Sequence, residues 1–436
     1  MLTRRSALSL GIAVPGLTAL AACGPNAAGG SGGSGGEDGS ASLRLAWWGN
    51  PTRDENTQNV VDAYEEVEPD VSISLEPGEW SGYWDKLATQ TAGGDFPDIV
   101  QMDEKYLAEY GERGALLDLA DAGLDTSDFA PGSVETGELP DVGLAAITAG
   151  LNALAFLINP VVFEEAGVDI PDDTTWTWEE LRETAAAISE WGADQGVTGL
   201  DVFGQGAAEL GAWARQSGQQ LFPREDETAV DAETITSFLE YAKSLIEEGA
   251  TPGVDAQIED VGAGVEQGRF GTGKSVFHLQ FHTQVQTFAS ASGAAMTLLR
   301  LPARTSGDHQ MVNKASMYWS IAATSAAPES AGILMDFLLT DPEAAKALRL
   351  ERGVTAFPEV QSAIEDELDE IERICLDFAR DLQAEVSPAP LVTPADAVGF
   401  GEEFTRISQE YYFGSKDAQA TAQEILTVLE GMQPSQ

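Results

Sequence analysis

The sequence predicts an α/β protein of two domains, for three reasons. Near the start of the globular part, segments that alternate apolar and polar residues, as strands do, are separated by segments with helical spacing. The order strand, helix, strand, helix, strand is typical of a parallel sheet. The 436 residues, 43% of them hydrophobic, can bury a substantial core, and that length implies two domains rather than one.

The elements follow one another closely between residues 42 and 102. Residues that are apolar at every second position predict strands, and apolar residues three or four apart predict helices. The expected order is a strand at 42–48, a helix at 54–66, a strand at 71–75, a helix at 83–91 and a strand at 99–102. Farther along the chain, residues 275–281 and 317–322 also alternate like strands.

The segment before the first strand is a predicted export signal that ends in a lipidation site. Arg4 and Arg5 precede an apolar stretch too short to span a hydrocarbon core of about 30 Å, and small residues lead up to Cys23. The stretch resembles a bacterial lipobox, whose cysteine receives a diacylglyceryl group. We therefore expect a signal peptide at 1–22 and a lipid anchor on the outer face of the cytoplasmic membrane. The alternative is an ordinary signal peptide with a chance cysteine.

The export route stays open, whereas the segment after the anchor is easier to interpret. The Arg4-Arg5 pair resembles a twin-arginine signal, but Ala7 stands where that motif prefers a bulky apolar residue, so the general secretory route is an equal alternative. Residues 23–41 consist of the cysteine and a run of mainly Gly, Ser, Ala and Pro. Such a run predicts a flexible linker with a reach of about 25 Å.

The charge of the chain restricts its partners. There are 72 acidic and 23 basic residues, a formal net charge of −49, spread along the sequence rather than gathered in one block. Nucleic acid and anionic lipid would both be repelled by such a surface. We therefore expect no nucleic-acid partner, and contact with the membrane through the lipid anchor alone.

The second cysteine, Cys375, is predicted to be structural. No intrachain disulfide is available once Cys23 carries lipid. Apolar residues at spacings of three and four predict one helix face that includes it; these residues are Ile364, Leu368, Ile371, Cys375, Phe378 and Leu382. A buried cysteine is the expected state, and a reactive thiol is the alternative.

Several long segments together resemble one known family. They are LRLAWWGN at 43–50, VSISLEPGEWSGYWDKLATQTAGGDFPDIVQMD at 71–103, ALLDLAD at 115–121, LNALAFLINPVVFEEAGVDIPDDTTWTWEELRETAAAI at 151–188, GVEQGRFGTGKSVFHLQFHTQV at 264–285 and SIAATSAAPESAGILMDFLLTDPEAAKALRLERGVTAFPEV at 320–360. In this succession the chain resembles the extracellular solute-binding proteins of family 1, which are similar to maltose-binding protein and serve carbohydrate ABC importers. The resemblance extends over nearly all of residues 42–436.

The resemblance implies a fold and a function. The expected fold is the periplasmic-binding-protein fold, two α/β lobes with a ligand cleft and a hinge between them. Residues 42–151 with 315–353 would form the N-terminal lobe, and 152–314 with 354–436 the C-terminal lobe. The implied protein is a monomer without a cofactor that binds a sugar or oligosaccharide by lobe closure and delivers it to the membrane permease. The resemblance also implies that the protein is not an enzyme.

Candidate ligand contacts lie just beyond predicted strand ends, where ligands bind in open α/β sheets. Sugars combine apolar C–H faces with hydroxyl groups, so flat aromatic rings beside carboxylates, amides or arginines suit them. The candidates of these types are Trp48, Asn50, Glu79, Trp80, Asp103, Phe281, His282, Tyr318 and Trp319. The family resemblance adds Asn152, Gln205, Trp213, Arg352 and Phe400. Four other tryptophans are expected to pack in the core or against helices, namely Trp47, Trp84, Trp176 and Trp178.

Two sequence patterns suggest functions that their context does not support, a nucleotide site and a membrane span. Residues 268–275 fit the phosphate-loop pattern G-x-x-x-x-G-K-[ST], but a phosphate loop must leave a strand and enter a helix, and here a strand follows. The uncharged run 142–163 is long enough for a membrane span, yet Asn152 and the Asn159-Pro160 pair interrupt it. Two buried strands joined by a hinge suit this run better.

Metal binding and catalysis find little support in the sequence. His278 and His282 would lie roughly 13 Å apart on a strand, too far to share a metal ion, and His309 stands alone in a turn-like segment. Carboxylates are too numerous for a catalytic pair to be picked out.

Two alternatives to a sugar-binding importer subunit remain. One is a secreted carbohydrate-active enzyme, and the other is a binder of the same fold for a glycerophosphodiester or a polyamine. We expect Arg352 to be nearly alone among basic residues at the strand ends, which disfavours a phosphate ligand.

Overall fold

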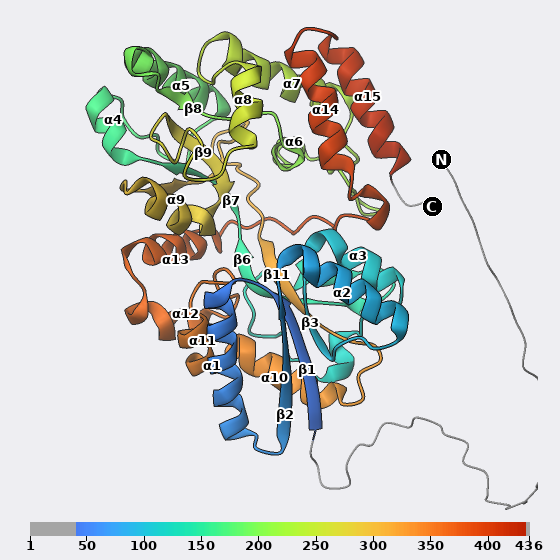
Figure 1. Ribbon diagram of the computed structural model, residues 1–436. Helices are drawn as coiled ribbons and strands as arrows, with labels where there is room; N and C mark the ends of the chain where they lie inside the picture. Colours follow the sequence, from blue (N-terminus) through green and yellow to red (C-terminus); the bar gives the residue numbers. More distant parts are fainter. Residues whose placement is uncertain (1–40, 433–436) are drawn as a thin grey trace, which may run out of the picture. The chain divides into compact units, whose positions relative to one another are not determined.

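The computed structural model describes residues 41–432 and has an α/β fold with two mixed sheets (Figure 1). The first sheet has the strand order β2-β1-β3-β11-β6. Its strands are β1 (Ala41–Trp48), β2 (Val71–Gly78), β3 (Ile99–Met102), β6 (Ile147–Asn152) and β11 (Lys314–Ile321). β1, β2 and β3 are parallel, which confirms the predicted succession, and β11 runs antiparallel to both β3 and β6.

The helices that follow β1, β2 and β3 begin within three residues of each strand end. They are α1 (Pro51–Val67), α2 (Trp80–Gly93) and α3 (Glu104–Glu112). Asn50 accepts a hydrogen bond from the backbone N–H of Arg53, and Asp103 accepts one from that of Lys105, so both residues cap helices. Three helix N-termini therefore lie at the carboxyl edge of the sheet.

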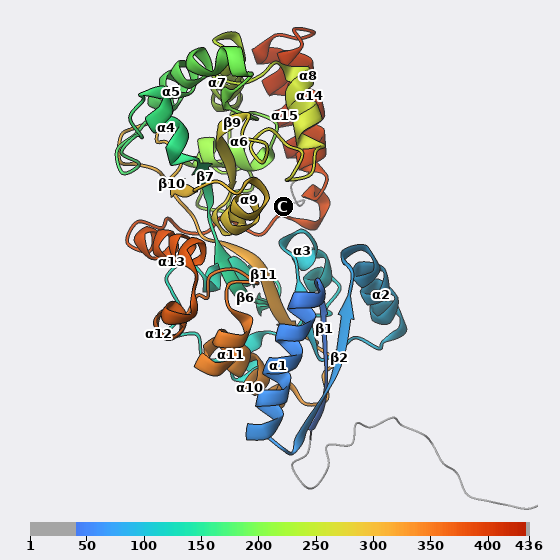
Figure 2. The ribbon, with the colours of Figure 1, turned by 60° about the vertical axis from the view of Figure 1, so that its left-hand side comes forward.

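The two faces of the first sheet are covered by different helices (Figures 1 and 2). Trp47 packs with residues of α1 and α10 (Pro328–Thr340), whereas Trp48 packs with residues of α2 and α3. This placement follows from the alternation of side chains along a strand. The predicted packing roles of Trp47 and of Trp84 in α2 are confirmed, because both side chains are buried.

The second sheet has the order β10-β7-β9-β8 and a core of its own. Its strands are β7 (Leu154–Ile158), β8 (Thr198–Leu200), β9 (Ser275–Phe281) and β10 (Thr297–Leu299). The helices between β7 and β10 are α4 (Pro160–Ala166), α5 (Trp178–Gly192), α6 (Ala207–Arg215), α7 (Ala232–Glu247), α8 (Val254–Val261) and α9 (Val285–Ser292). Trp176 and Trp178 are buried in this core, as predicted, and Trp178 begins α5.

The remaining elements follow β11, apart from the short hairpin β4 (Glu138–Leu139) and β5 (Gly143–Leu144). They are α11 (Pro342–Leu348), α12 (Pro358–Ile364), α13 (Glu370–Leu382), α14 (Phe400–Tyr412) and α15 (Ala418–Gly431). α14 and α15 pack on the second sheet's core, to which α13 also contributes.

The prediction of one continuous helix face at 364–382 is wrong. α12 ends at Ile364, and Asp369 caps a new helix by accepting hydrogen bonds from the N–H groups of Ile371 and Glu372.

Cys375 is nevertheless structural, as predicted. It lies on the buried face of α13, and burial raises the pKa of its thiol well above the usual range. A thiol held protonated in this way is a poor nucleophile. The alternative of a reactive cysteine is therefore not supported.

The uncharged run 142–163 contains β6 and β7, with only Ala153 between them. The chain passes here from the first sheet to the second, which confirms the prediction of two buried strands. Among residues 41–432, no helix combines the length and apolar character that a membrane span requires. The predicted signal, Cys23 and the linker up to residue 40 lie outside the described residues.

The phosphate-loop pattern at 268–275 leads into a strand, as predicted. Ser275 begins β9, and the Nζ of Lys274 donates to the backbone carbonyl of Gln195 rather than facing a helix N-terminus.

We expect Lys274→Ala to leave ligand affinity unchanged and to lower the free energy of unfolding by less than about 0.5 kcal/mol, because an exposed lysine contributes little. ATP binding by the wild-type protein that disappears in this variant would contradict the interpretation.

The histidines do not converge on one metal site. His278 Nδ1 lies 2.7 Å from Asp201 Oδ2, whereas His282 Nδ1 accepts a hydrogen bond of 2.9 Å from the backbone of Ala153. Both nitrogens of His309 lie within hydrogen-bond distance of backbone carbonyls, those of Leu301 and Thr174. Within 41–432 no group of three potential metal ligands is present.

Candidate functional site

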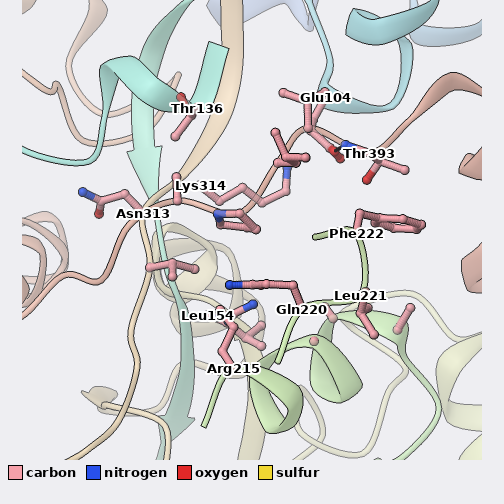
Figure 3. Close-up of a pocket in the computed structure, with 18 of the residues that line it drawn as sticks. Glu104, Thr136, Leu154, Arg215, Gln220, Leu221, Phe222, Asn313, Lys314 and Thr393 are labelled. Atoms are coloured by element: carbon pink, nitrogen blue, oxygen red, sulfur yellow. Dashed lines mark hydrogen bonds between the residues drawn. The ribbon is translucent and has the colours of Figure 1, made fainter. Parts of the chain in front are cut away.

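Two cavities meet where the strands of the two sheets end. The larger, which we call the polar groove, has a volume of about 710 Å³, and the smaller, the apolar pocket, about 280 Å³. Phe281 at the end of β9 and Lys314 at the start of β11 line both cavities. Figure 3 shows the apolar pocket with Lys314 beside Asn313, and Arg215 and Gln220 pointing into the same space.

The position of the polar groove follows from the topology. Asn50 follows β1, Asp103 follows β3 and Asn152 ends β6, and all three line the groove. Since β11 runs antiparallel to β3 and β6, its first residues lie at the edge where those two strands end. The groove therefore lies at the carboxyl edge of the first sheet, where ligands bind in open α/β folds.

The polar groove is rich in amides and hydroxyls. These side chains are Asn50, Thr52, Asn56, Asn152, Thr283, Gln284, Gln286, Thr287 and Ser316. They come from segments that belong to both sheets. The Oγ1 of Thr283, just after β9, donates a hydrogen bond of 2.6 Å to Oδ1 of Asn152 in β6. Such groups can donate to and accept from a ligand that carries many hydroxyls.

Charged residues surround these amides. Arg53 Nε donates to Glu351 Oε1 at 3.1 Å, and Asn50 donates to the same oxygen. Arg349 is paired with Glu372 of α13. The prediction that Arg352 would be nearly alone is wrong, because Arg53, Lys314 and Arg349 line the same groove. These residues meet through contacts between distant parts of the chain, which spacing along the sequence does not reveal.

Arg352 is the most deeply buried of these cations. Its Nε donates to Oε1 of Gln101 at 2.9 Å and its Nη2 to Oγ1 of Thr57 at 2.8 Å. Its guanidinium carbon lies 5.2 Å from the ring centroid of Trp319, a cation–π arrangement. Burial and the nearby Arg53 lower the pKa of Arg352 to about 9, which leaves the side chain charged at neutral pH.

The apolar pocket has a different lining. Its apolar residues include Leu154, Leu221, Phe222, Phe281 and Tyr318. Glu104 accepts a hydrogen bond from the backbone N–H of Thr393, and both residues are shown in Figure 3. The Tyr318 hydroxyl donates to the carbonyl of Thr136. Burial lowers the pKa of Arg215 to about 10. A ring or hydrocarbon face fits this lining better than a set of hydroxyls.

The structure brings together some of the predicted contact residues. Asn50, Asp103, Asn152, Phe281 and Arg352 line the polar groove, and Phe281 and Tyr318 line the apolar pocket. Lys314, Arg53 and Glu351 also belong to the site but were missed. The only sequence signal for Lys314 is its position shortly before the predicted strand 317–322; in the structure it begins β11. Arg53 lies in the first turn of α1.

Other predicted residues lie elsewhere in this conformation. Trp48 and Trp80 contact each other edge to face with ring centroids 5.1 Å apart, and Trp80 is 44% exposed. Glu79 precedes α2 at its N-cap position, without a side-chain capping hydrogen bond. Five others are buried in the cores, namely Gln205, Trp213, His282, Trp319 and Phe400. Burial lowers the pKa of His282 to about 4, so this ring is neutral at pH 7. A ligand contact by these residues stays a prediction.

Known proteins resemble the chain at the levels of sequence and fold. An uncharacterized lipoprotein of Streptomyces antibioticus is 28% identical over 261 residues, which cover 52% of this chain and 53% of that protein. The chain thus spans about half the length of the curated relatives it matches.

Two solved structures share the fold. An extracellular solute-binding protein of family 1 from Alicyclobacillus acidocaldarius superposes with a TM-score of 0.73 at 25% identity, over 91% of this chain and 99% of that one. A periplasmic oligogalacturonide-binding protein from Yersinia enterocolitica, in complex with saturated digalacturonic acid, superposes with a TM-score of 0.72 at 20% identity, over 91% and 100%. The model of the family described as bacterial extracellular solute-binding protein matches residues 59–370, more than half of the sequence. The chain therefore belongs to the bacterial extracellular solute-binding protein family.

Proposed function

We propose that this solute-binding protein is the lipid-anchored binding subunit of an ABC importer, and that its ligand is a sugar or oligosaccharide held in the polar groove. The observation that carries the proposal is the lining of the groove, in which amides and hydroxyls converge from segments of both sheets. A saccharide presents many hydroxyls, and each can both donate and accept a hydrogen bond. The ligand of the Yersinia structure, a digalacturonic acid, supports the same ligand class.

Lobe closure is the proposed mechanism. We assign residues 42–151 with 315–353 to one lobe and 152–314 with 354–436 to the other, so that Ala153 between β6 and β7 lies at a hinge. A ligand that contacts Asn50 on one side and Gln284 on the other has more contacts when the lobes are closed. It therefore shifts the population toward the closed form, which the permease recognises. Binding alone performs this function, and the ligand leaves chemically unchanged.

The neighbouring apolar pocket extends the proposed site. Phe281 contributes to the linings of both cavities. One sugar ring packed on Phe281 would leave its hydroxyls toward the polar groove and its C–H face toward the pocket. An oligosaccharide, rather than a single sugar, would then contact both cavities.

A calorimetric screen tests this function. Purified protein is titrated with mono- and oligosaccharides, and each ligand is recovered and analysed after incubation. We expect a narrow subset to bind, to raise the melting temperature because only the folded form holds the ligand, and to return intact. A glycerophosphodiester or a polyamine that binds when no saccharide does would identify the alternative ligand class. A hydrolysed product would instead identify an enzyme.

The anchor is tested separately. We expect Cys23→Ser to release the protein from the membrane fraction without changing its melting temperature, because the lipid would be attached at this residue alone and far from the folded part. Fractionation of cells that express either form measures the distribution. Unchanged membrane association of the Cys23→Ser protein would contradict the proposed lipidation.

A further inference from the structure

We infer that the ligand of the polar groove carries an anionic oxygen group, a carboxylate or a phosphate ester, and that Arg352 binds this group. The inference rests on the proposed function and names the chemical class of its ligand as an acidic saccharide. The charge of the groove differs from that of the whole chain.

The groove is locally positive in a strongly acidic protein. Its charged lining consists of four basic side chains, Arg53, Lys314, Arg349 and Arg352, and three acidic ones, Asp103, Glu351 and Glu372. The chain as a whole has 23 basic and 72 acidic residues. A surface of that composition repels anions in general, so a basic lining of this size indicates that one particular anion is favoured.

Among the residues that the structure describes, only two of the four basic side chains in the lining form ion pairs within the groove. Glu351 is paired with Arg53 and Glu372 with Arg349. The carboxylate that remains, Asp103, accepts the backbone hydrogen bond that caps α3. Two cations are left, and within residues 41–432 neither Lys314 nor Arg352 forms an ion pair with a carboxylate. Lys314 instead lies 5.9 Å from the ring of Phe281.

Arg352 holds an unused donor at the groove. The residue is 3% exposed, and while Nε and Nη2 have acceptors, Nη1 is buried without one among the described residues. A buried donor without a partner is costly, and a charged one especially so. Since Arg352 lines the groove, a ligand oxygen is the acceptor that the fold leaves open. Nη1 is shielded from solvent in this structure. The proposed hydrogen bond between Nη1 and the ligand oxygen therefore requires the side chains that line the groove to move when the ligand binds.

The backbone fixes Arg352 in this place. A Cβ at Gly150 would lie 2.2 Å from the carbonyl oxygen of Arg352, and Gly353 has a φ of 99°, a conformation that favours glycine. The Ser316 hydroxyl in β11 donates to the same carbonyl oxygen. Arg352 is thus held between β6 and β11, with Trp319 against its guanidinium group. The guanidinium group is oriented by Gln101, Thr57 and Trp319, and a guanidinium in a defined orientation suits an anionic oxygen.

Matched ligands test the inference. The purified protein is titrated with galactotriose and trigalacturonate, and with glucose and glucose 6-phosphate, in 0.15 M salt. We expect an acidic probe to bind at least about tenfold more tightly than its neutral counterpart, as charge-assisted hydrogen bonds require. The arm that binds, uronate or phosphate, identifies the anionic group. Equal or tighter binding of a neutral probe would overturn the inference and leave the proposed function intact. If no probe binds, the calorimetric screen decides: a neutral saccharide that binds there would overturn the inference alone, and the absence of any saccharide ligand would overturn both.

Two variants locate the contact. Arg352→Lys keeps a positive charge but loses the fork that holds Gln101 and Thr57, so its folding is checked by its melting temperature. Lys314→Met removes the second unpaired cation from a partly exposed position. We expect each to weaken binding of the acidic probe by about tenfold or more, while Lys274→Ala, outside the groove, leaves it unchanged. A folded Arg352→Lys that binds the acidic probe with wild-type affinity would overturn the assignment of Arg352. If Arg352→Lys does not fold, wild-type affinity of Lys314→Met would overturn the inference that the unpaired charge of the groove binds an anion.

Discussion

Trp176→Ala is expected to lower the free energy of unfolding by about 3–5 kcal/mol, the cost of removing a large aromatic side chain from a packed core. Trp176 is 1% exposed and packs on Phe156 and Phe277, with ring centroids 5.8 and 6.1 Å away. Its indole N–H has no hydrogen-bond partner in the described structure, so the loss is one of packing alone. Urea denaturation followed by tryptophan fluorescence and circular dichroism measures the change.

A matched control separates packing from surface effects. Phe413 is 52% exposed at the end of α14, and we expect Phe413→Ala to cost less than about 1 kcal/mol. Trp176 lines neither cavity, so the folded Trp176→Ala protein should keep the ligand affinity of the wild type. A loss of affinity without a loss of stability would contradict its assignment to the core.

Phe281→Ala is expected to weaken saccharide binding by about 1–3 kcal/mol, a factor of about 5–150, because an aromatic platform and its buried area are lost. Phe281 ends β9, where it pairs with Leu154, and it lines both cavities. The side chain is only half-buried, so the melting temperature should fall by a few degrees at most. Calorimetric titration with the tightest saccharide from the screen gives the affinity.

The conservative variant is the control for this result. Phe281→Tyr keeps the ring and is expected to bind within about threefold of the wild type, since stacking depends on the aromatic face. Equal affinities of wild type and Phe281→Ala would show that the ligand does not contact this ring. The polar groove would then have to hold the ligand without an aromatic partner, contrary to the proposed site.

The early part of the fold was predictable because local signals agree with one another there. Strand β3 has the predicted bounds, 99–102, and β9 the predicted bounds, 275–281. In both, a run of strand-forming residues lies between turn residues or helix caps, so propensity and pattern point the same way. The antiparallel direction of β11 was not predictable, since it depends on pairing between residues more than 200 positions apart.

The helix pattern at 364–382 shows where such signals conflict. Apolar spacing continues through this stretch, but Asp369 offers a side-chain acceptor that caps a new helix. The cap interrupts the helix while Leu368 stays buried between the two helices. Periodicity alone therefore overestimates a helix when a strong N-cap residue lies inside the pattern.

The candidate site was predictable to the extent that it follows from strand ends. Asn50, Asp103 and Phe281 were placed by that rule and line the groove. The charges of the groove were not predictable, because Arg53 and Glu351 are 298 positions apart and meet only in the folded chain. The sequence therefore indicated the edge of the sheet but missed the basic character of the site.

A crystal structure of the protein with the saccharide that binds most tightly in the screen is the most direct test of the proposed binding site and of lobe closure. We predict that the saccharide lies in the polar groove, with its oxygens within hydrogen-bond distance of Asn50 after β1 and of Gln284 after β9, and with one ring packed on Phe281. Residues from both proposed lobes would then contact one ligand, as closure requires. A saccharide bound outside the groove, or one held by residues of a single lobe, would contradict the proposal.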